Sequence, residues 1–257
     1  MSETTWLWVG CAGMALGAVA LFVRGGRRTL DEEAQTVVHV LVPLVAALSY
    51  LAMATGQGTV TLASGRELHL ARYLDWSVTT PLLLLGLAMT ALHGAHRRRP
   101  LVAALLAADV LMVLTGLFYG ASDAAGPKWT WYLVSCGAFV AVYATLLGPL
   151  RREAAARDAV RRAVYRRELT LLALLWLVYP VVDLLGENGL RVVGTVVTTA
   201  VFTVVDLAAK VVYGAVCVAG SREVADHDFA TDAVEPAPVS TEAVPSGGSA
   251  APARPSA

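Results

Sequence analysis

The sequence predicts an all-α membrane protein, a bundle of seven transmembrane helices. Of its 257 residues, 56% are apolar and only 16% are charged, whereas soluble domains carry about 25% charged residues. The mean hydropathy is +0.61. Seven apolar runs follow one another along the chain, and the basic residues gather in alternate loops between them. These observations together favour a chain that crosses a bilayer seven times.

Each apolar run is long enough for one crossing. At 1.5 Å per residue, a helix of about 20 residues spans the roughly 30 Å of hydrocarbon, and it satisfies its own backbone groups there. Arg24 follows the first run, whereas the basic residues of a signal peptide precede its apolar stretch, so this run is expected to be a retained span. The runs cover residues 6–23, 37–56, 73–92, 101–120, 129–148, 169–186 and 192–219.

The arginines predict which way the bundle faces. Short loops with excess Lys and Arg stay in the cytoplasm, and three alternate loops carry nearly all of them: Arg24, Arg27 and Arg28; Arg97, Arg98 and Arg99; and seven arginines between 151 and 167. The other loops hold only Arg66, Lys128 and Arg191, with Arg72 at the mouth of the third span. The amino terminus is therefore expected outside and the carboxyl terminus inside, in a multi-pass protein of the plasma membrane.

Two segments outside the spans have their own predictions. The outside loop 57–70 alternates polar and apolar residues between glycines, a pattern that favours a short hairpin. After Gly220 the composition changes to Ala, Pro, Ser, Gly and acids, which cannot bury enough apolar surface to fold. We therefore expect a transmembrane domain over residues 1–220 and a disordered cytoplasmic tail over 221–257.

The composition also excludes several classes of protein. Twenty basic residues balance twenty acidic ones, so there is no general basic surface for nucleic acid. Cys11, Cys136 and Cys217 all lie in apolar runs, which argues against a disulfide framework and a cysteine-based metal site. No internal repeat is visible, which weakens an inverted-repeat transporter interpretation.

Ionisable residues inside the apolar runs point to function. Lys210 stands in the middle of the last run, and Asp206 lies four residues earlier, on the same helix face. In the third run, Arg72, Asp75, Thr79 and Gly86 recur at spacings of three, four and seven, so they form one inward stripe. A structural ion pair is the simpler explanation for Lys210 and Asp206, but apolar replacements of such pairs often stabilise a protein. The additional buried charges on the third run therefore favour a functional site.

Three motifs on these spans carry a family resemblance. They are Arg72-Tyr73-x-Asp75-Trp76-x-x-Thr79-Thr80-Pro81, Trp176-x-x-Tyr179-Pro180 and Asp206-x-x-x-Lys210. In this order they resemble the third, sixth and seventh helices of the microbial (type 1) rhodopsins, close in pattern to the bacteriorhodopsin-like group. The resemblance covers roughly residues 6–220. It implies that Lys210 binds all-trans retinal as a Schiff base, which is protonated in the dark and isomerises on absorbing light. It also implies a homo-oligomer, trimeric or pentameric, in a lipid bilayer.

The chemistry of these residues agrees with the resemblance. A lysine amine condenses with a carbonyl, and the resulting cation needs buried counter-charges, which Asp75 and Asp206 can supply. Once light moves the chromophore, the balance of charges changes and a proton can leave. Asp75 is expected to be its first acceptor, with Thr79, one turn deeper, as a hydrogen-bond partner.

The resemblance also implies a retinal pocket. Trp76 and Trp176 resemble the two tryptophans that sandwich the polyene, and Tyr50 and Tyr179 resemble the hydroxyl donors that hold Asp206. Thr80 and Asp109 resemble an interhelical hydrogen-bonded pair. Tyr132 fills the place where a glycine opens a window for a carotenoid antenna, so retinal is expected to be the only chromophore. The remaining wall is expected to contain Leu83, Met112, Gly116, Ser135, Phe139 and Pro180.

The residues expected on the cytoplasmic side differ from those of most outward proton pumps of the family. Gly86 stands where many outward proton pumps have a carboxylic donor, so Asp75, Thr79 and Gly86 resemble the Asp-Thr-Gly subgroup of eubacterial rhodopsins. His39 is the candidate donor in its place. His39 precedes Tyr50 by eleven residues, about 16 Å of helix, and Gly86 follows Asp75 by the same number. Because Tyr50 and Asp75 are both expected near the Schiff base, His39 and Gly86 should lie at a similar depth on its cytoplasmic side. The alternative is a histidine that only bonds a backbone carbonyl or faces the headgroups.

The residues expected on the extracellular side also differ from those typical of the family. Asn188 and Thr198 stand in place of the family's paired glutamates, which leaves Glu187 as the nearest acid. Asp183 replaces a usual aromatic residue and is either a solvent-facing acid at a helix end or part of the release path. Ser49 excludes the histidine–aspartate counterion of some bacterial pumps.

The leading function is a light-driven outward proton pump, a transporter without a conventional enzymatic substrate. Asp75 argues against a chloride pump, and the Thr79–Gly86 pairing argues against the sodium-pump pattern. The main alternative is a photosensor that signals to a cytoplasmic partner, because sensors also lack the carboxylic donor. A seven-helix transporter or receptor without chromophore requires Lys210 to be incidental.

Overall fold

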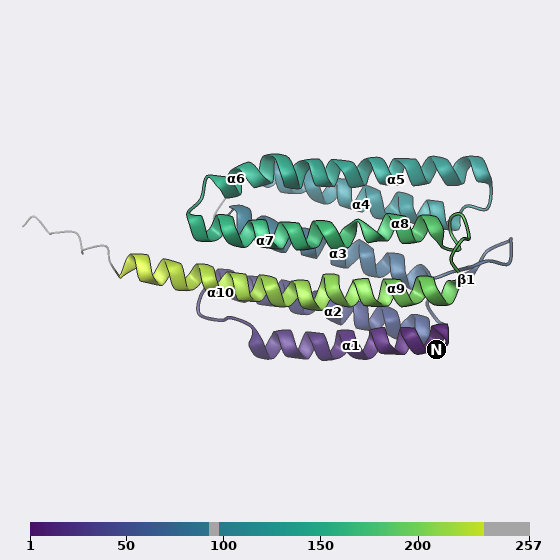
Figure 1. Cartoon of the computed structure of the whole chain (residues 1–257), viewed down its shortest axis with the longest axis horizontal. Helices are drawn as coiled ribbons and strands as arrows, with labels where there is room; N and C mark the ends of the chain where they lie inside the picture. The colour runs from purple at the N-terminus through teal and green to yellow at the C-terminus, as the bar shows by residue number, and fades with distance from the viewer. Residues whose placement is uncertain (93–97, 234–257) are drawn as a thin grey trace, which may run out of the picture.

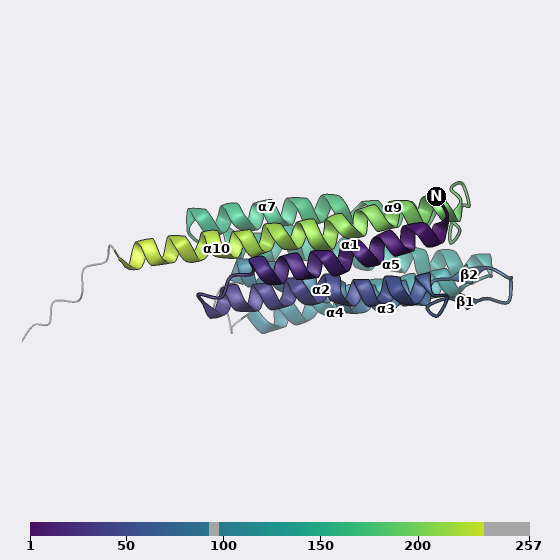
Figure 2. The ribbon, with the colours of Figure 1, turned by 90° about the horizontal axis from the view of Figure 1, so that it is seen from below.

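The chain folds into a bundle of seven membrane-length helical segments that lie side by side (Figures 1 and 2). The computed structural model describes residues 1–92 and 98–233. Arg97, part of one predicted basic loop, and residues 234–257 of the predicted tail lie outside them. Large apolar side chains such as Leu16, Phe22 and Leu174 are exposed on the outer faces of the bundle, as expected for surfaces that face lipid. The predicted fold class and number of spans are confirmed.

Four of the spans are single helices, and three are divided by a π-helical turn or a short break. The single helices are α1 (Glu3–Arg24), α2 (Leu30–Ala54), α3 (Leu70–Leu92) and α4 (Arg99–Ala121). The fifth span comprises α5 (Ala125–Thr145), η2 (Leu146–Leu150) and α6 (Arg151–Ala155). The sixth comprises α7 (Ala159–Trp176) and α8 (Val178–Leu185), and the seventh comprises α9 (Thr195–Leu207), η3 (Ala208–Val212) and α10 (Tyr213–Asp232).

Side-chain caps fix where three of the helices begin. The Ser2 hydroxyl accepts a hydrogen bond from the backbone NH of Thr5 at the start of α1. Thr29 does the same for Glu32 in α2, and Asp158 does so for Arg161 in α7. Each cap satisfies one of the free NH groups of a first helical turn, which explains why these helices begin several residues before the apolar runs.

The predicted hairpin lies at the same end of the bundle as the amino terminus (Figure 1). Strand β1 (Val60–Thr61) pairs antiparallel with β2 (Glu67–Leu68), and Gly65 takes a φ of +80° in the turn, a conformation that favours glycine. Ser64 and Arg66 bind the Asp123 carboxylate of the α4–α5 loop. These hydrogen bonds hold the pKa of Asp123 below its ordinary value. We call this the hairpin end of the bundle and the opposite end, where α10 finishes, the tail end.

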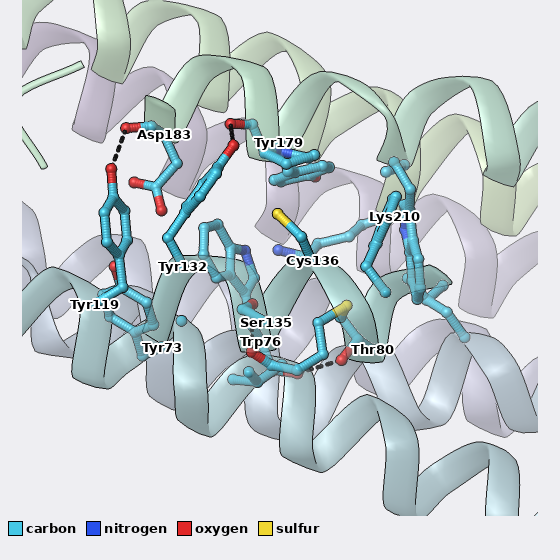
Figure 3. Close-up of a pocket in the computed structure, with 18 residues that line it drawn as sticks. Tyr73, Trp76, Thr80, Tyr119, Tyr132, Ser135, Cys136, Tyr179, Asp183 and Lys210 are labelled. Atoms are coloured by element: carbon cyan, nitrogen blue, oxygen red, sulfur yellow. Dashed lines mark hydrogen bonds between the residues drawn. The ribbon is translucent and has the colours of Figure 1, made fainter. Parts of the chain in front are cut away.

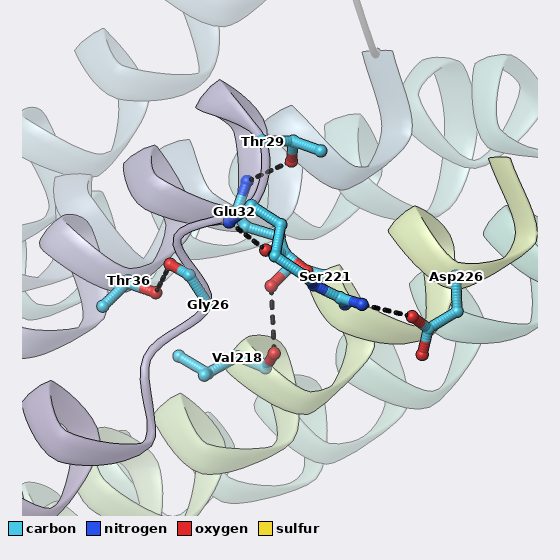
Figure 4. A network of polar contacts seen from close by, with 8 residues as sticks. Gly26, Thr29, Glu32, Thr36, Val218, Ser221 and Asp226 are labelled. Atoms are coloured by element: carbon cyan, nitrogen blue, oxygen red, sulfur yellow. Dashed lines mark hydrogen bonds and ion pairs between the residues drawn. The ribbon is translucent and has the colours of Figure 1, made fainter. Parts of the chain in front are cut away.

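The last helix is longer than predicted. Helix α10 continues to Asp232, so residues 221–232 are helical and the expected boundary at residue 220 is wrong. Its acidic residues bind arginines from distant parts of the chain: Asp226 binds Arg28 at 2.6 Å (Figure 4), and Asp228 binds Arg161 at 2.6 Å. Hydrogen bonds to Glu32 and Asp226 raise the pKa of the Arg28 guanidinium. Such partners are invisible in the local composition on which the predicted boundary depended.

Candidate functional site

Lys210 lies at the centre of the bundle, inside the π-helical turn η3. Such turns interrupt the regular i to i−4 ladder and are common at functional sites. The side chain is 2% exposed. Its Nζ atom donates to Asp75 Oδ2 at 2.5 Å and to Asp206 Oδ1 at 3.0 Å. The two acids predicted from the apolar runs therefore meet at the one lysine of the last span.

Asp206 is held by two tyrosines. Tyr50 from α2 donates to Asp206 Oδ2 at 2.8 Å, and Tyr179 from α8 donates to Oδ1 at 2.7 Å. This arrangement, which we expected from the resemblance, satisfies both carboxylate oxygens and fixes the group as an anion partner of Lys210.

Asp75 is held less tightly than Asp206. Its second oxygen, Oδ1, has no hydrogen-bond partner among the described residues. The Thr79 hydroxyl donates to the backbone carbonyl of Asp75 at 2.9 Å, so its main bond is with the backbone and not the expected carboxylate. A carboxylate with one free oxygen beside the Lys210 amine is chemically suited to accept a proton.

Arg72, expected on the same inward stripe as Asp75, does not join the charges around Lys210. It forms no ion pair with Asp75 or Asp206 in the described part of the chain. Its guanidinium instead lies over the Phe202 ring, 4.5 Å from the centroid, and two of its nitrogens have no hydrogen-bond partner. The side chain lines a second cavity toward the hairpin end. Arg72 therefore stands between the buried charges and that cavity.

Lys210 also forms part of the wall of a cavity between α3, α4, α5, α7, α8 and η3 (Figure 3). The cavity and its opening to solvent together enclose about 820 Å³ of space. Its wall is mostly aromatic and aliphatic. It contains all of the residues expected to bind the chromophore except Tyr50, which holds Asp206 from outside the cavity: Trp76, Thr80, Leu83, Met112, Gly116, Tyr132, Ser135, Phe139, Trp176, Tyr179, Pro180 and Lys210.

Hydrogen bonds between helices fix several of these side chains. Thr80 donates to Asp109 Oδ2 at 2.8 Å, which confirms the expected interhelical pair. Ser135 donates to the Met112 carbonyl at 2.9 Å, and Tyr132 donates to the Pro180 carbonyl at 3.2 Å (Figure 3). The cavity is thus preformed by contacts that do not depend on a ligand.

Comparison with known proteins identifies the family. The sequence profile described as "Bacteriorhodopsin-like protein" matches residues 1–224. The chain belongs to the bacteriorhodopsin-like family. A bacteriorhodopsin from Haloterrigena sp. (strain arg-4) is 38% identical over 220 residues, which cover 83% of this chain and 86% of that protein.

Solved rhodopsin structures share the fold. The thermophilic rhodopsin from Rubrobacter xylanophilus superposes with a TM-score of 0.83 at 36% identity, over 88% of this chain and 98% of that one. The light-driven proton pump rhodopsin of Coccomyxa subellipsoidea gives a TM-score of 0.77 at 31% identity, over 84% and 96% of the two chains. This bacteriorhodopsin-like chain is therefore a multi-pass protein of the cell membrane.

The second cavity of this bacteriorhodopsin-like protein opens the site toward the hairpin end. It holds about 1220 Å³, opening included, and its wall contains Arg72, Asp183 and Glu187. Asp183 lines both cavities and accepts a hydrogen bond from Asn188 at 2.9 Å. The partly buried Asp183 therefore lies between the two cavities.

Sequence reasoning missed two acids in the wall of this cavity, Glu3 and Glu67. Glu3 lies in the wall of the second cavity, where it is 2.8 Å from His69 Nε2 and accepts from Thr199 at 3.0 Å. It stands before the first apolar run, so only a prediction of how α1 packs against α9 could have found it. Tyr73, Tyr119 and Cys136 in the wall of the first cavity were also missed, because they look like packing residues in the sequence.

His39 and Gly86 lie together on the tail-end side of Lys210. A Cβ atom on Gly86 would be only 2.6 Å from His39 Cε1, so the glycine leaves the space that the imidazole occupies. His39 is fully buried, and its Nδ1 lies 2.8 Å from the Gln35 carbonyl. Its Nε2 has no partner among the described residues. The backbone bond foreseen in the alternative interpretation is thus present, yet the second ring nitrogen stays free.

Proposed function

We propose that this protein is a light-driven outward proton pump that binds all-trans retinal through Lys210. One observation carries the proposal: a buried lysine, paired with two carboxylates, lies in the wall of a largely apolar cavity. The names of its relatives support it, since one solved relative is described as a light-driven proton pump. The main functional alternative is photosensing, which would use the same cavity.

The residues present fit retinal. The amine needed for covalent attachment lies in the cavity wall, and Trp76, Trp176 and Tyr179 supply aromatic surface for a long apolar polyene. Bound there, retinal supplies absorption of visible light, a change of shape on isomerisation, and a nitrogen-bound proton that can be released. The protein supplies the counter-charges, the shape of the cavity and the groups that receive and return the proton.

We assign the first proton acceptance to Asp75. Its Oδ2 already lies 2.5 Å from the Lys210 nitrogen, and its Oδ1 is free to change partners. Asp206 keeps its charge because two tyrosine hydroxyls hold it. The proton then leaves through the second cavity, past Arg72. The acids on its wall are Glu3, Glu67, Asp183 and Glu187.

The direction of transport follows from the topology that the arginines predict. We assign the tail end to the cytoplasm, since the basic loops lie there, and the hairpin end to the outside. On the basis of Asp75, Thr79 and Gly86, we assign the chain to the Asp-Thr-Gly subgroup. The protein is expected to work as a trimer or pentamer in the bilayer.

Illumination of cells that express the protein, supplied with retinal, tests the pump directly. We expect an unbuffered suspension to acidify in the light and this acidification to vanish with a protonophore. A light-induced absorbance change without any acidification would instead identify a photosensor. A colourless protein after addition of retinal would contradict both functions.

His39 is the proposed donor that returns a proton from the cytoplasmic side. A neutral imidazole with a free Nε2 suits reversible transfer near neutral pH. We expect His39→Leu to slow reprotonation, followed by flash photolysis, by about 100-fold, the contribution of a positioned acid. Azide, a small diffusible proton carrier, should restore much of the rate.

The control for His39 is the same substitution at His227, a partly exposed histidine of α10 near the tail end. His227→Leu should leave reprotonation unchanged. If His39→Leu also has wild-type kinetics without azide, His39 is not the donor.

A further inference from the structure

A group of unpaired polar atoms lies in the tail-end half of the bundle, away from the site already described. Among the described residues, Gln35 Oε1, His39 Nε2, Tyr213 Oη and both carboxyl oxygens of Glu168 are buried without a hydrogen-bond partner. Each such atom costs about 1–3 kcal/mol if it stays unpaired. Groups of this kind are the usual binding sites for internal water. Together these atoms form a polar path through an otherwise apolar part of the protein.

Glu168 is the outermost member of this cluster. It lies on α7 and is completely buried, yet its neighbour Arg167 forms an ion pair with Glu223 of α10 at 3.2 Å, and both of those side chains are 47% exposed. A Cβ atom on Gly220 would be 2.7 Å from Glu168 Oε1 and 3.3 Å from Arg167 Nη2. The acid therefore lies close to a solvent-exposed pair, and the missing side chain of Gly220 lets Glu168 and Arg167 approach α10 closely.

On its inner side, Glu168 approaches the neighbourhood of His39. The side chains of Thr90 and Cys217 lie next to it. Gln35 connects Thr90 to the histidine: its Nε2 donates to Thr90 Oγ1 at 3.1 Å and to the Gly86 carbonyl at 2.9 Å. Gln35 Oε1 and His39 Nε2 both point to the place that a Gly86 side chain would fill, at 3.3 and 3.0 Å from its Cβ position. Polar groups thus extend from the exposed pair to the imidazole.

A purely structural role does not account for Glu168. The titratable groups around it are Arg167 and Glu223 toward the tail end and Cys217, Tyr213 and Tyr165 on the inner side. None of them forms an ion pair with its carboxyl group in the described part of the chain, and neither carboxyl oxygen has a hydrogen bond of ordinary geometry there. A buried acid without a partner is costly for stability and is by default a functional hypothesis in a membrane protein.

We infer that Glu168 is the proton-uptake group that supplies His39 from the cytoplasm, a role that rests on the proposed pump. The Glu168 carboxyl releases its proton inward, through water held by Thr90 and Gln35, to the free Nε2 of the neutral His39 imidazole, and the resulting imidazolium passes that proton on toward Lys210. The resulting Glu168 carboxylate then takes a proton from bulk water on the side of the exposed Arg167–Glu223 pair. One proton enters and one moves inward, so charge and atoms balance.

Glu168→Gln in the full-length, retinal-loaded protein tests this role. The amide keeps the shape of the side chain but cannot release a proton. We expect pigment colour and transfer to Asp75 to stay unchanged, while proton uptake from the medium, followed with a pH-sensitive dye, slows on the order of 10-fold. This is less than the roughly 100-fold expected for loss of a direct donor. Azide should restore uptake, and Glu168→Asp should keep part of it.

Glu33→Gln is the matched control, because Glu33 is an exposed acid at the same end of the bundle. It should show wild-type uptake. Wild-type uptake in Glu168→Gln as well would overturn the proposal.

Infrared difference spectroscopy separates this proposal from the pump itself. Illumination of the wild type should change a carboxylic C=O stretching band that is missing in Glu168→Gln and shifted in Glu168→Asp. If the wild type fails to acidify the medium but this band still changes, proton exchange at Glu168 stands while the pump does not. If the wild type pumps but no band is lost in Glu168→Gln, the proposal about Glu168 is wrong and the pump stands.

Discussion

Lys210→Ala is expected to give a colourless protein after addition of retinal. The substitution removes the amine that lies in the cavity wall between Asp75 and Asp206, so no covalent attachment is possible. It also leaves two buried carboxylates without their cation, which costs about 3–5 kcal/mol unless they take up protons. The absorbance spectrum of the purified protein is the measurement, and circular dichroism confirms that the helices are still formed.

The chain offers an unusually clean control for this experiment. Its only other lysine is Lys128, which lies at the hairpin end with its Nζ 5.6 Å from the centroid of the Tyr119 ring. Lys128→Ala should bind retinal and take on full colour. A coloured, photoactive Lys210→Ala protein would contradict the assignment.

Asp75→Asn is expected to abolish light-driven acidification, a loss of at least about 100-fold. Asparagine keeps the shape of the side chain but removes the negative charge next to the Lys210 nitrogen and the group that accepts its proton. The absorption maximum should also move to longer wavelength, because a counter-charge at the nitrogen stabilises the ground state, in which the positive charge is localised there. Both effects can be measured on one preparation.

Asp109→Asn controls for the loss of a buried acid. Asp109 is as deeply buried as Asp75, but it binds the Thr80 hydroxyl, and an asparagine oxygen can still accept that hydrogen bond. This variant should keep pumping. If Asp75→Asn pumps as well as Asp109→Asn does, another group is the acceptor.

The site residues that the sequence predicted best share one property. Each is a charged residue inside an otherwise apolar run. Lys210, Asp206 and Asp75 all stand inside stretches that would otherwise face lipid, so their convergence follows from the cost of leaving a charge in hydrocarbon. The regular rise of an α-helix predicted the shared depth of His39 and Gly86, since His39 is eleven residues from Tyr50 and Gly86 is eleven residues from Asp75. The contact between them in the structure agrees with that estimate.

The features that the sequence did not predict depend on contacts between distant segments. Glu168 follows Arg166 and Arg167, so it resembles the last charge of a solvated loop, and only the packing of α7 against α10 buries it. The extension of α10 depends on Arg28 and Arg161, which lie far away in the sequence. The place of Arg72 over Phe202 required a contact between α3 and α9. Composition and periodicity contain no information on any of these pairings.

Covalent attachment of retinal to Lys210 is the claim on which every step of the proton path depends, and peptide mass spectrometry tests it most directly. Borohydride reduction of the illuminated pigment makes the lysine–retinal bond permanent, and proteolysis then separates the two lysines of the chain. We expect the retinal-derived mass on the peptide that contains Lys210 and on no other. Its presence on the Lys128 peptide, or its absence from both in a coloured sample, would contradict the proposed mechanism.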